Sequence, residues 1–217
     1  MTETGKKKLK ASLWSLLYVA IAVSIVVSSV FIFKNFYFEV VFVNGGSMNP
    51  TLCGGDAEGY HDYGINDKSY GAKRGLKRYQ VVTTYYPYDE GLSNPSYKIK
   101  RVIGLPGDTL KVEHNDLYLY DRNTLSWKGP MEMPFTRNLD GANRNQDTIT
   151  LKDDEYFLAG DNWVASTDSF DPSVGPIKFS LLVGAVVRIE GRAKVNGKTI
   201  YDKIPYSEPM YFLGVDY

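Results

Sequence analysis

An uninterrupted apolar stretch near the start of the chain is its strongest pattern. Residues 11–33 include no charged side chain. As a helix they would be about 35 Å long, enough to cross a hydrocarbon layer of about 30 Å. Basic residues precede the stretch, namely Lys6, Lys7, Lys8 and Lys10, whereas only Lys34 follows closely. Because cytoplasmic flanks carry the excess of lysine and arginine, we expect a cytoplasmic N-terminus and the remaining chain outside the cytoplasm.

A cleaved secretory signal is the alternative interpretation of this stretch. The apolar core of such a signal is normally about 7–15 residues long and ends at a small-x-small cleavage site. Here the run is longer and ends in Phe31-Ile32-Phe33-Lys34. Aromatic residues continue through position 38, and such residues favour a membrane–water interface. The sequence therefore predicts an uncleaved membrane anchor.

After the anchor the pattern changes to short runs of β-branched and aromatic residues separated by Gly, Pro, Asn and Asp, which is typical of strands and turns. The predicted strands cover residues 36–43, 79–86, 97–103, 109–112, 117–120, 148–151, 156–158 and 181–189. Residues 54–75 and 160–176 are predicted loops. No amphipathic helical stripe follows the anchor. We expect a mainly β protein, in which one transmembrane helix precedes an all-β body that is barrel-like or made of two packed sheets.

These patterns divide the chain into four predicted parts. They are a basic cytoplasmic tail at 1–10, a transmembrane anchor at 11–33, an extracytoplasmic β domain at 34–190 and a C-terminal tail at 191–217. Within the β domain, residues 123–147 are polar and irregular and are interpreted as a surface extension without a core of its own. The sequence assigns no role to the C-terminal tail.

Composition excludes several classes of function. The 217 residues are 43% apolar and 23% charged, as in ordinary globular proteins. The formal net charge is zero, which gives no indication of a nucleic-acid partner. With Cys53 as its one cysteine, the chain can form no intrachain disulfide and no cysteine-rich zinc site. No phosphate-binding or dinucleotide-binding glycine motif is present, so we expect neither a metal nor a cofactor.

Ser47 is a candidate nucleophile because it lies in a rigid turn. Gly45 and Gly46 precede it, and Pro50 follows. Glycines permit backbone conformations that other residues avoid, and proline stiffens the exit of the turn. Taken alone, such a turn is found in many proteins without any catalytic role. Since His61 and His114 both fall in predicted turns or loops, a Ser-His-Asp triad is poorly supported.

Lys100 offers a different way to activate a serine. A free lysine has a pKa of about 10.4, but burial among apolar groups can lower it by several units, so that the neutral amine becomes a base. Lys100 alternates with apolar residues on the predicted strand 97–103, and Arg101 points to the opposite face. The pattern favours a serine–lysine pair. An ordinary solvent-facing strand lysine is the alternative.

Three motifs occur in order along the chain. They are Ser47-Met48-x-Pro50-Thr51-Leu52, then Lys100-Arg101-Val102-Ile103-Gly104-Leu105-Pro106-Gly107-Asp108, then Gly160-Asp161-Asn162 with Ser166-x-Asp168-Ser169. Together with the anchor and the weaker segment 78–83, they resemble bacterial type I signal peptidase across residues 6–189. This resemblance implies a serine endopeptidase of the bacterial cell membrane that removes signal peptides from exported preproteins after Ala-x-Ala. Its implied partners are preprotein signal peptides and membrane lipid, with no nucleic acid and no assigned oligomeric state.

The resemblance also implies roles for individual residues. Ser47 is similar to the nucleophile, and its backbone N–H to an oxyanion donor. Lys100 is similar to the general base, which Ser166 would orient. Asp161 would pair with Arg101 and join two loops. The residues implied to line shallow pockets for small substrate side chains are Val43, Met48, Leu52 and Ile99.

The chain departs from the family pattern at four positions. Trp163 and Phe170 stand where arginine is usual, so the ion pair from Asp168 to the second arginine is expected to be missing. Gly45 replaces a serine present in some members, and Lys98 an aromatic residue. The missing arginines leave open a non-catalytic, membrane-anchored accessory protein that binds signal-peptide-like segments. A cytosolic Ser-Lys self-cleaving repressor shares the chemistry, but the anchor disfavours it.

Overall fold

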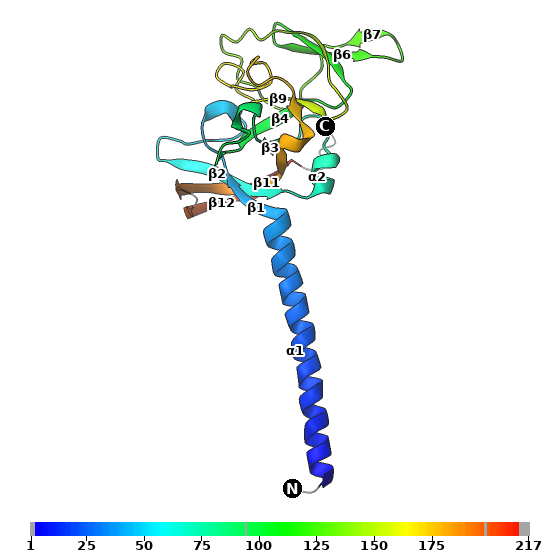
Figure 1. Cartoon of the computed structure of the whole chain (residues 1–217). Helices are drawn as coiled ribbons and strands as arrows, with labels where there is room; N and C mark the ends of the chain where they lie inside the picture. The colour runs from blue at the N-terminus through cyan, green and yellow to red at the C-terminus, as the bar shows by residue number, and fades with distance from the viewer. Residues whose placement is uncertain (1–2, 94, 198, 213–217) are drawn as a thin grey trace. The chain divides into compact units, whose positions relative to one another are not determined.

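The structure is a computed structural model and describes residues 3–93, 95–197 and 199–212 (Figure 1). It divides into two compact units, Met1–Glu39 and Val40–Tyr217. Residues 1 and 2 of the predicted basic tail and residues 213–217 of the predicted C-terminal tail lie outside the described residues.

The first unit consists mainly of the helix α1, which spans Glu3–Tyr37. From Glu3 onward, the predicted tail and the anchor are therefore parts of one continuous helix. Its segment Ser12–Phe33 has a mean hydropathy of 2.6 and is long and apolar enough to cross a membrane. No residue of its apolar window is buried by protein. No glycine or proline follows Gly5 within it, so the helix continues to Tyr37, and the strand predicted from residue 36 begins at Phe38.

The second unit is built from two antiparallel sheets. In the larger sheet the strands follow the order β1 (Phe38–Phe42), β2 (Tyr60–Asp67), β11 (Leu182–Asn196), β3 (Val81–Thr84), β4 (Lys98–Gly104), β9 (Glu155–Ala159) and β10 (Ile177–Lys178), with β12 (Thr199–Tyr211) also paired to β11. The smaller sheet has the order β7 (Ser126–Lys128), β6 (Asp116–Asp121), β5 (Thr109–Glu113) and β8 (Gln146–Thr150). In Figure 1 the β6–β7 ribbon projects from the body. The predicted mainly β, two-sheet architecture is confirmed.

Residues 54–75, predicted as a loop, contain the strand β2 and the short helix α2 (Tyr70–Arg74). The prediction is wrong because β2 lacks the alternating apolar pattern. Its buried residues include the polar Asp62 and Asn66, and pairing with β11 gives it its place in the sheet. Ser69 is the N-cap of helix α2, and its hydroxyl accepts a hydrogen bond from the Ala72 amide.

The folded unit continues past the predicted boundary at residue 190. Strand β11 runs through that position to Asn196, and β12 returns along it in antiparallel register. Gly197 lies between them with φ 61, a conformation that suits glycine in a tight turn. A large part of the predicted C-terminal tail is thus an integral strand of the larger sheet.

The predicted surface extension, residues 123–147, contributes β7 and the first residues of β8 but packs mainly as irregular chain. Its partly buried apolar side chains cover a core cluster that includes Ile103, Phe157 and Trp163. The covering side chains are Met131, Met133, Phe135 and Ala142. The extension is therefore fixed onto the body next to β4 and β9, and this brings its arginines toward the candidate site.

Candidate active site

Ser47 and Lys100 meet at the centre of the larger sheet. Ser47 is the middle residue of a 3-10 turn, Gly46–Met48, and Lys100 is in the interior of β4. The Lys100 Nζ and Ser47 Oγ atoms lie 2.7 Å apart, in hydrogen-bond contact. Lys100 is only 4% exposed. The two residues that the sequence singled out 53 positions apart are therefore direct neighbours.

The environment of Lys100 favours its neutral form. Burial lowers the pKa of Lys100 from 10.5 to about 8, while the Asp168 carboxylate opposes this change. With a pKa of about 8, about one lysine in ten is uncharged at pH 7, against well under one in a thousand for a free lysine. The site thus contains an amine that can accept a proton from the adjacent hydroxyl near neutral pH.

The backbone around Ser47 is held by the loop that follows β9. The Asn162 amide donates to the Ser47 carbonyl (3.0 Å), and the Asn162 side chain donates to the Gly46 carbonyl (3.0 Å). Gly45 precedes the turn with φ 79, which glycine adopts without strain. Among the described residues, no side chain caps the turn. The amide N–H groups at its start therefore remain available to an incoming acceptor.

Arg101 and Asp161 form a buried ion pair behind the site. The Arg101 Nε and Nη2 atoms donate to the two Asp161 oxygens at 2.8 and 2.6 Å. Their side chains are 1% and 0% exposed. A third donor of Arg101 reaches the Tyr79 carbonyl at 2.7 Å, and the Phe135 ring lies 4.1 Å from the guanidinium. This pair joins β4 to the loop after β9, as the sequence suggested.

Asp168 has an ion-pair partner that the sequence did not reveal. Its Oδ1 atom accepts a 2.6 Å bond from Arg144 of the extension, and its Oδ2 atom accepts from the Gly160 amide at 2.9 Å. The ion pair to an arginine at position 170 is absent because that residue is Phe170, and Arg144 occupies the same role instead. Arg144 escaped prediction because it lies 24 residues earlier in an irregular polar segment, where no periodicity or motif distinguishes it.

Arginines of the extension also contact both aromatic residues that depart from the family pattern. The Arg144 guanidinium lies 4.8 Å from the centre of the Phe170 ring, and the Arg137 guanidinium 4.6 Å from Trp163. Such cation–π contacts stabilise a charge that is partly removed from water. The positive charges expected at residues 163 and 170 thus come from elsewhere in the chain.

Ser166 lies close to the turn but bonds another atom. Its Oγ donates a long, 3.5 Å bond to the Thr167 carbonyl. A Cβ placed on Gly160 would collide with both the Ser166 hydroxyl and the Ser47 carbonyl oxygen, so both groups lie against the same side of Gly160. Within the described residues, the Lys100 amine makes its hydrogen bond to Ser47 and not to Ser166.

The four predicted pocket residues come together in one apolar cluster. Their exposed fractions are 2% for Val43, 1% for Met48, 0% for Leu52 and 8% for Ile99. Phe212, the residue after β12, belongs to the same buried cluster and packs beside the candidate pocket.

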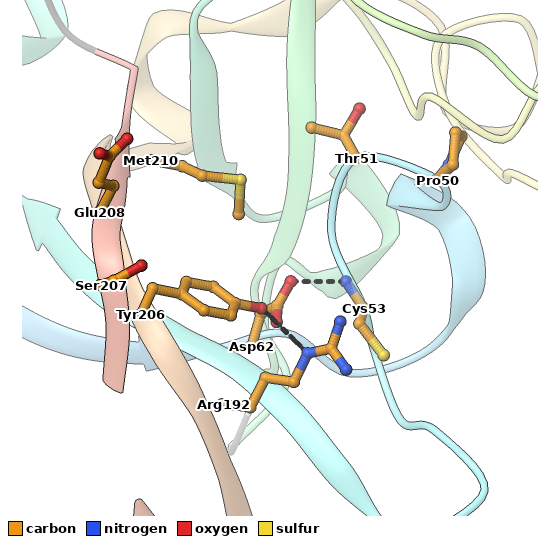
Figure 2. A pocket seen from close by; sticks show the side chains of 9 residues that line it. All are labelled: Pro50, Thr51, Cys53, Asp62, Arg192, Tyr206, Ser207, Glu208 and Met210. Carbon is orange, nitrogen blue, oxygen red and sulfur yellow. Dashed lines mark hydrogen bonds and ion pairs between the residues drawn. The ribbon is translucent and has the colours of Figure 1, made fainter. Parts of the chain in front are cut away.

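A cleft of about 340 Å³ is lined in part by the segment that follows Ser47. Its lining residues are Pro50, Thr51, Cys53, Asp62, Arg192, Tyr206, Ser207, Glu208 and Met210 (Figure 2). Asp62 accepts hydrogen bonds from the Cys53 amide (2.7 Å) and the Tyr206 hydroxyl (2.6 Å), and this fixes the cleft floor. The cleft therefore borders the segment that carries Met48 and Leu52 into the apolar cluster.

The other candidate groups have structural contacts. His61 Nδ1 donates to the Val43 carbonyl at 2.8 Å. His114 lies in the turn between β5 and β6 with φ 51. Within the described ranges, no group of three or more His, Cys, Asp and Glu side chains could hold a metal ion.

An apolar N-terminal helix, a two-sheet β body and a serine–lysine contact occur together in this chain. The family described as signal peptidase, peptidase S26, matches residues 14–189. The chain belongs to this family of peptidases.

Its relatives identify the type within the family. Signal peptidase I V of Bacillus subtilis strain 168 is 30% identical over 167 residues, which cover 70% of this chain and 86% of the relative. Signal peptidase I P of Bacillus subtilis subsp. natto is 30% identical over 152 residues, or 68% and 74% of the two chains. The crystal structure of a signal peptidase I from Enterococcus faecalis V583 aligns with a TM-score of 0.34 at 22% identity, covering 52% of this chain and 97% of that one. The sequence relatives confirm the resemblance to bacterial type I signal peptidase.

Proposed function

We propose that this chain is a membrane-anchored serine endopeptidase that removes signal peptides from exported preproteins after small-x-small sites. Ser47 is the nucleophile and Lys100 the general base. The observation that carries the proposal is the 2.7 Å contact between the Ser47 hydroxyl and a buried lysine whose pKa is lowered to about 8. A neutral amine at this distance is the activating group that a serine nucleophile requires.

The reaction follows from this pair. Lys100 takes the Ser47 proton as Oγ attacks the scissile carbonyl, and amide donors at the start of the 3-10 turn stabilise the oxyanion. When the C–N bond breaks, the Lys100 ammonium returns a proton to the leaving amine. Lys100 then deprotonates a water that hydrolyses the ester on Ser47 and releases the signal peptide. Because residue 45 is glycine, the oxyanion donors are backbone groups.

The surrounding residues serve this pair. Arg101 and Asp161 hold β4 against the loop that binds the Ser47 backbone. Asp168 fixes Gly160 of the same loop, and Ser166 lies beside the Ser47 carbonyl against Gly160. We assign to Ser166 the orientation of Lys100 once substrate is bound. The apolar cluster next to the turn is assigned the contact with small substrate side chains. Its members are Val43, Met48, Leu52 and Ile99.

The location follows from α1 and its flanks. The apolar segment Ser12–Phe33 anchors the protein in the bacterial cell membrane, among lipid, as a single pass. The lysines before this segment favour a cytoplasmic N-terminus and an extracytoplasmic catalytic domain. The arginines missing at 163 and 170 favour a non-catalytic accessory role as the alternative, and the Arg144–Asp168 pair weakens it by supplying the charge usual at 170.

Ser47→Ala is the direct test of the nucleophile. We expect the full-length variant in detergent to lose cleavage of a precursor with an Ala-x-Ala site by several orders of magnitude, because the attacking oxygen is absent. Cleavage is measured by the appearance of mature protein. The matched control is Ser180→Ala, since Ser180 is exposed and is likewise the middle residue of a 3-10 turn, Phe179–Leu181. Turnover retained in the Ser47 variant would sink the assignment.

Gly160→Ala tests whether the loop after β9 positions the nucleophile. The added Cβ would meet the Ser47 carbonyl oxygen and the Ser166 side chain, so the turn must shift. A displacement of about 1 Å in a reacting group can cost about 100-fold in rate, and we expect a loss of that order. The control is Gly71→Ala, where nothing lies within 4 Å of the added carbon. Equal cleavage rates in the two variants contradict the proposed positioning.

A further inference from the structure

We propose that Arg144, which lies outside the three sequence motifs that carry the resemblance, is a positioning residue of the serine–lysine site. It neutralises the Asp168 carboxylate that faces Lys100 and fixes the loop that carries Ser166. The proposal rests on the function proposed above, because it concerns the charge state of the same base. It assigns a catalytic support role to the extension 123–147.

The Arg144 guanidinium contacts one loop through three separate donors. Its Nη1 atom donates to Asp168 Oδ1 (2.6 Å), its Nη2 atom to the Ser166 carbonyl (2.6 Å) and its Nε atom to the Trp163 carbonyl (2.7 Å). The side chain is 13% exposed. Three acceptors around one planar group match the fixed fork of arginine, which lysine cannot reproduce. Arg144 therefore sets both the shape of the loop and the charge on Asp168.

The backbone of Arg144 is itself held in place. Its amide donates to Asn115 Oδ1 at 2.7 Å, and its carbonyl accepts from the Asn115 amide at 3.0 Å. Asn115 lies in the turn between β5 and β6, and the Phe170 ring covers the guanidinium. Asn115 fixes the backbone of Arg144, and Phe170 packs on its guanidinium. The side chain therefore loses little conformational entropy when its guanidinium binds the loop.

Hydrogen bonds continue from Asp168 to the nucleophile. Asp168 Oδ2 accepts from the Gly160 amide at 2.9 Å. Two residues later the Asn162 amide donates to the Ser47 carbonyl at 3.0 Å. A change in the Arg144–Asp168 pair therefore reaches the nucleophile through one short segment, residues 160–162.

Among the charges around Lys100, that of Asp168 has the largest effect on the Lys100 pKa. Asp168 and Asp161 raise the pKa of Lys100, whereas Lys98 and Arg144 lower it, and the Asp168 effect is the largest of the four. Asp161 is engaged by Arg101. The adjacent strand β3, Val81–Thr84, carries no charged residue, and the 3-10 turn contributes the Ser47 hydroxyl. Without Arg144, an unpaired buried carboxylate would hold Lys100 in its charged form.

The test is the pH profile of cleavage by full-length Arg144→Gln in detergent. We expect the rise of activity with pH to move up by about one unit, with about a tenfold loss at pH 7, because less of Lys100 is neutral. The double variant Arg144→Gln/Asp168→Asn removes both charges and should return the profile toward the wild-type position. Arg144→Lys keeps the charge but loses the fork, so its profile should stay near wild type while the rate falls.

A purely structural role predicts a different pattern. It gives an equal loss at every pH and a double variant worse than either single variant, and that result overturns the proposal. Arg137→Gln is the control, because Arg137 belongs to the same extension and stacks on Trp163 but is not among the charges that shift Lys100. If Arg144→Gln does not fold, Asp168→Asn replaces it as the test. Removing this carboxylate should lower the Lys100 pKa, so the pH profile of cleavage must move to lower pH. An unchanged profile refutes the inference.

A second readout separates this inference from the proposed function. The pH dependence of Lys100 acylation by acetic anhydride, followed by mass spectrometry, reports the ionisation of the amine without cleavage. If the acylation midpoint rises in Arg144→Gln while no Ser47-dependent cleavage exists, the inference stands and the proposed function fails. If cleavage depends on Ser47 but the pH midpoints of cleavage and of Lys100 acylation both stay unchanged in Arg144→Gln, the inference fails and the proposed function stands.

Discussion

Lys100→Met should abolish cleavage and at the same time stabilise the fold at neutral pH. The buried ammonium is unfavourable in the folded state, which is why burial lowers the Lys100 pKa from 10.5 to about 8. A change of that size corresponds to a cost on the order of 3 kcal/mol when the lysine must be charged. Methionine replaces the apolar stem without the charge. It leaves the Ser47 hydroxyl without its partner, a smaller loss of about 1 kcal/mol.

The stability difference between Lys100→Met and the wild type should depend on pH. Between a folded pKa of about 8 and an unfolded value of 10.5, the unfolded chain binds more protons, so wild-type stability rises with pH across this window. The advantage of Lys100→Met is therefore full below pH 8 and shrinks toward pH 10.5. Urea unfolding of the full chain in detergent at pH 7 and pH 10 measures it. As control, Lys178→Met on the exposed face of β10 should change stability little. A variant no more stable than wild type at pH 7 contradicts the prediction.

Asp161→Ala should be among the most destabilising single substitutions in the β unit. It leaves the Arg101 guanidinium, 1% exposed, without its counter-charge. Breaking a buried pair in this way costs about 3–5 kcal/mol, because the remaining charge stays desolvated. Urea unfolding measures the loss, and cleavage should fall in parallel since the loop that binds the Ser47 backbone loses its tie to β4.

Two control variants separate the cost of leaving one charge unpaired from the net contribution of the ion pair to stability. Arg101→Met/Asp161→Leu removes both charges and should recover much of the lost stability, because apolar replacements of buried pairs are often tolerated. Glu113→Gln breaks the exposed ion pair between Glu113 and Lys111. The Glu113 side chain is 52% exposed, so the loss should be less than about 1 kcal/mol. A loss of similar size in Asp161→Ala and Glu113→Gln is the outcome that would refute the argument.

The sequence predicted those parts of the molecule whose signals are local. The uncharged run 11–33 is sufficient to identify the apolar part of α1, and the alternation around Lys100 identifies β4. The turn at Ser47 could be recognised because its glycines and proline constrain the backbone directly. The contact between Ser47 and Lys100 also follows from the family motifs, since their order and rough spacing resemble those of known peptidases.

The remainder depends on contacts between distant segments. Strand β2 buries polar side chains, Asp62 and Asn66, so no hydrophobic alternation marks it. Strand β12 is largely exposed and contains Pro205, and its pairing with β11 is what makes it a strand. The partner of Asp168 is set by how the extension folds back onto the body. Single-segment patterns carry no information of this kind.

The Arg144–Asp168 pair also bears on how a site of this type can change over evolutionary time. What Asp168 requires is a guanidinium at one place in space, and here a residue 24 positions away in the chain supplies it. Aromatic side chains fill the places left at 163 and 170, and arginines from the extension cover them. Within such a family, a lost motif residue is therefore weak grounds for calling a member inactive. The safer criterion is whether the buried carboxylate still has a counter-charge in three dimensions.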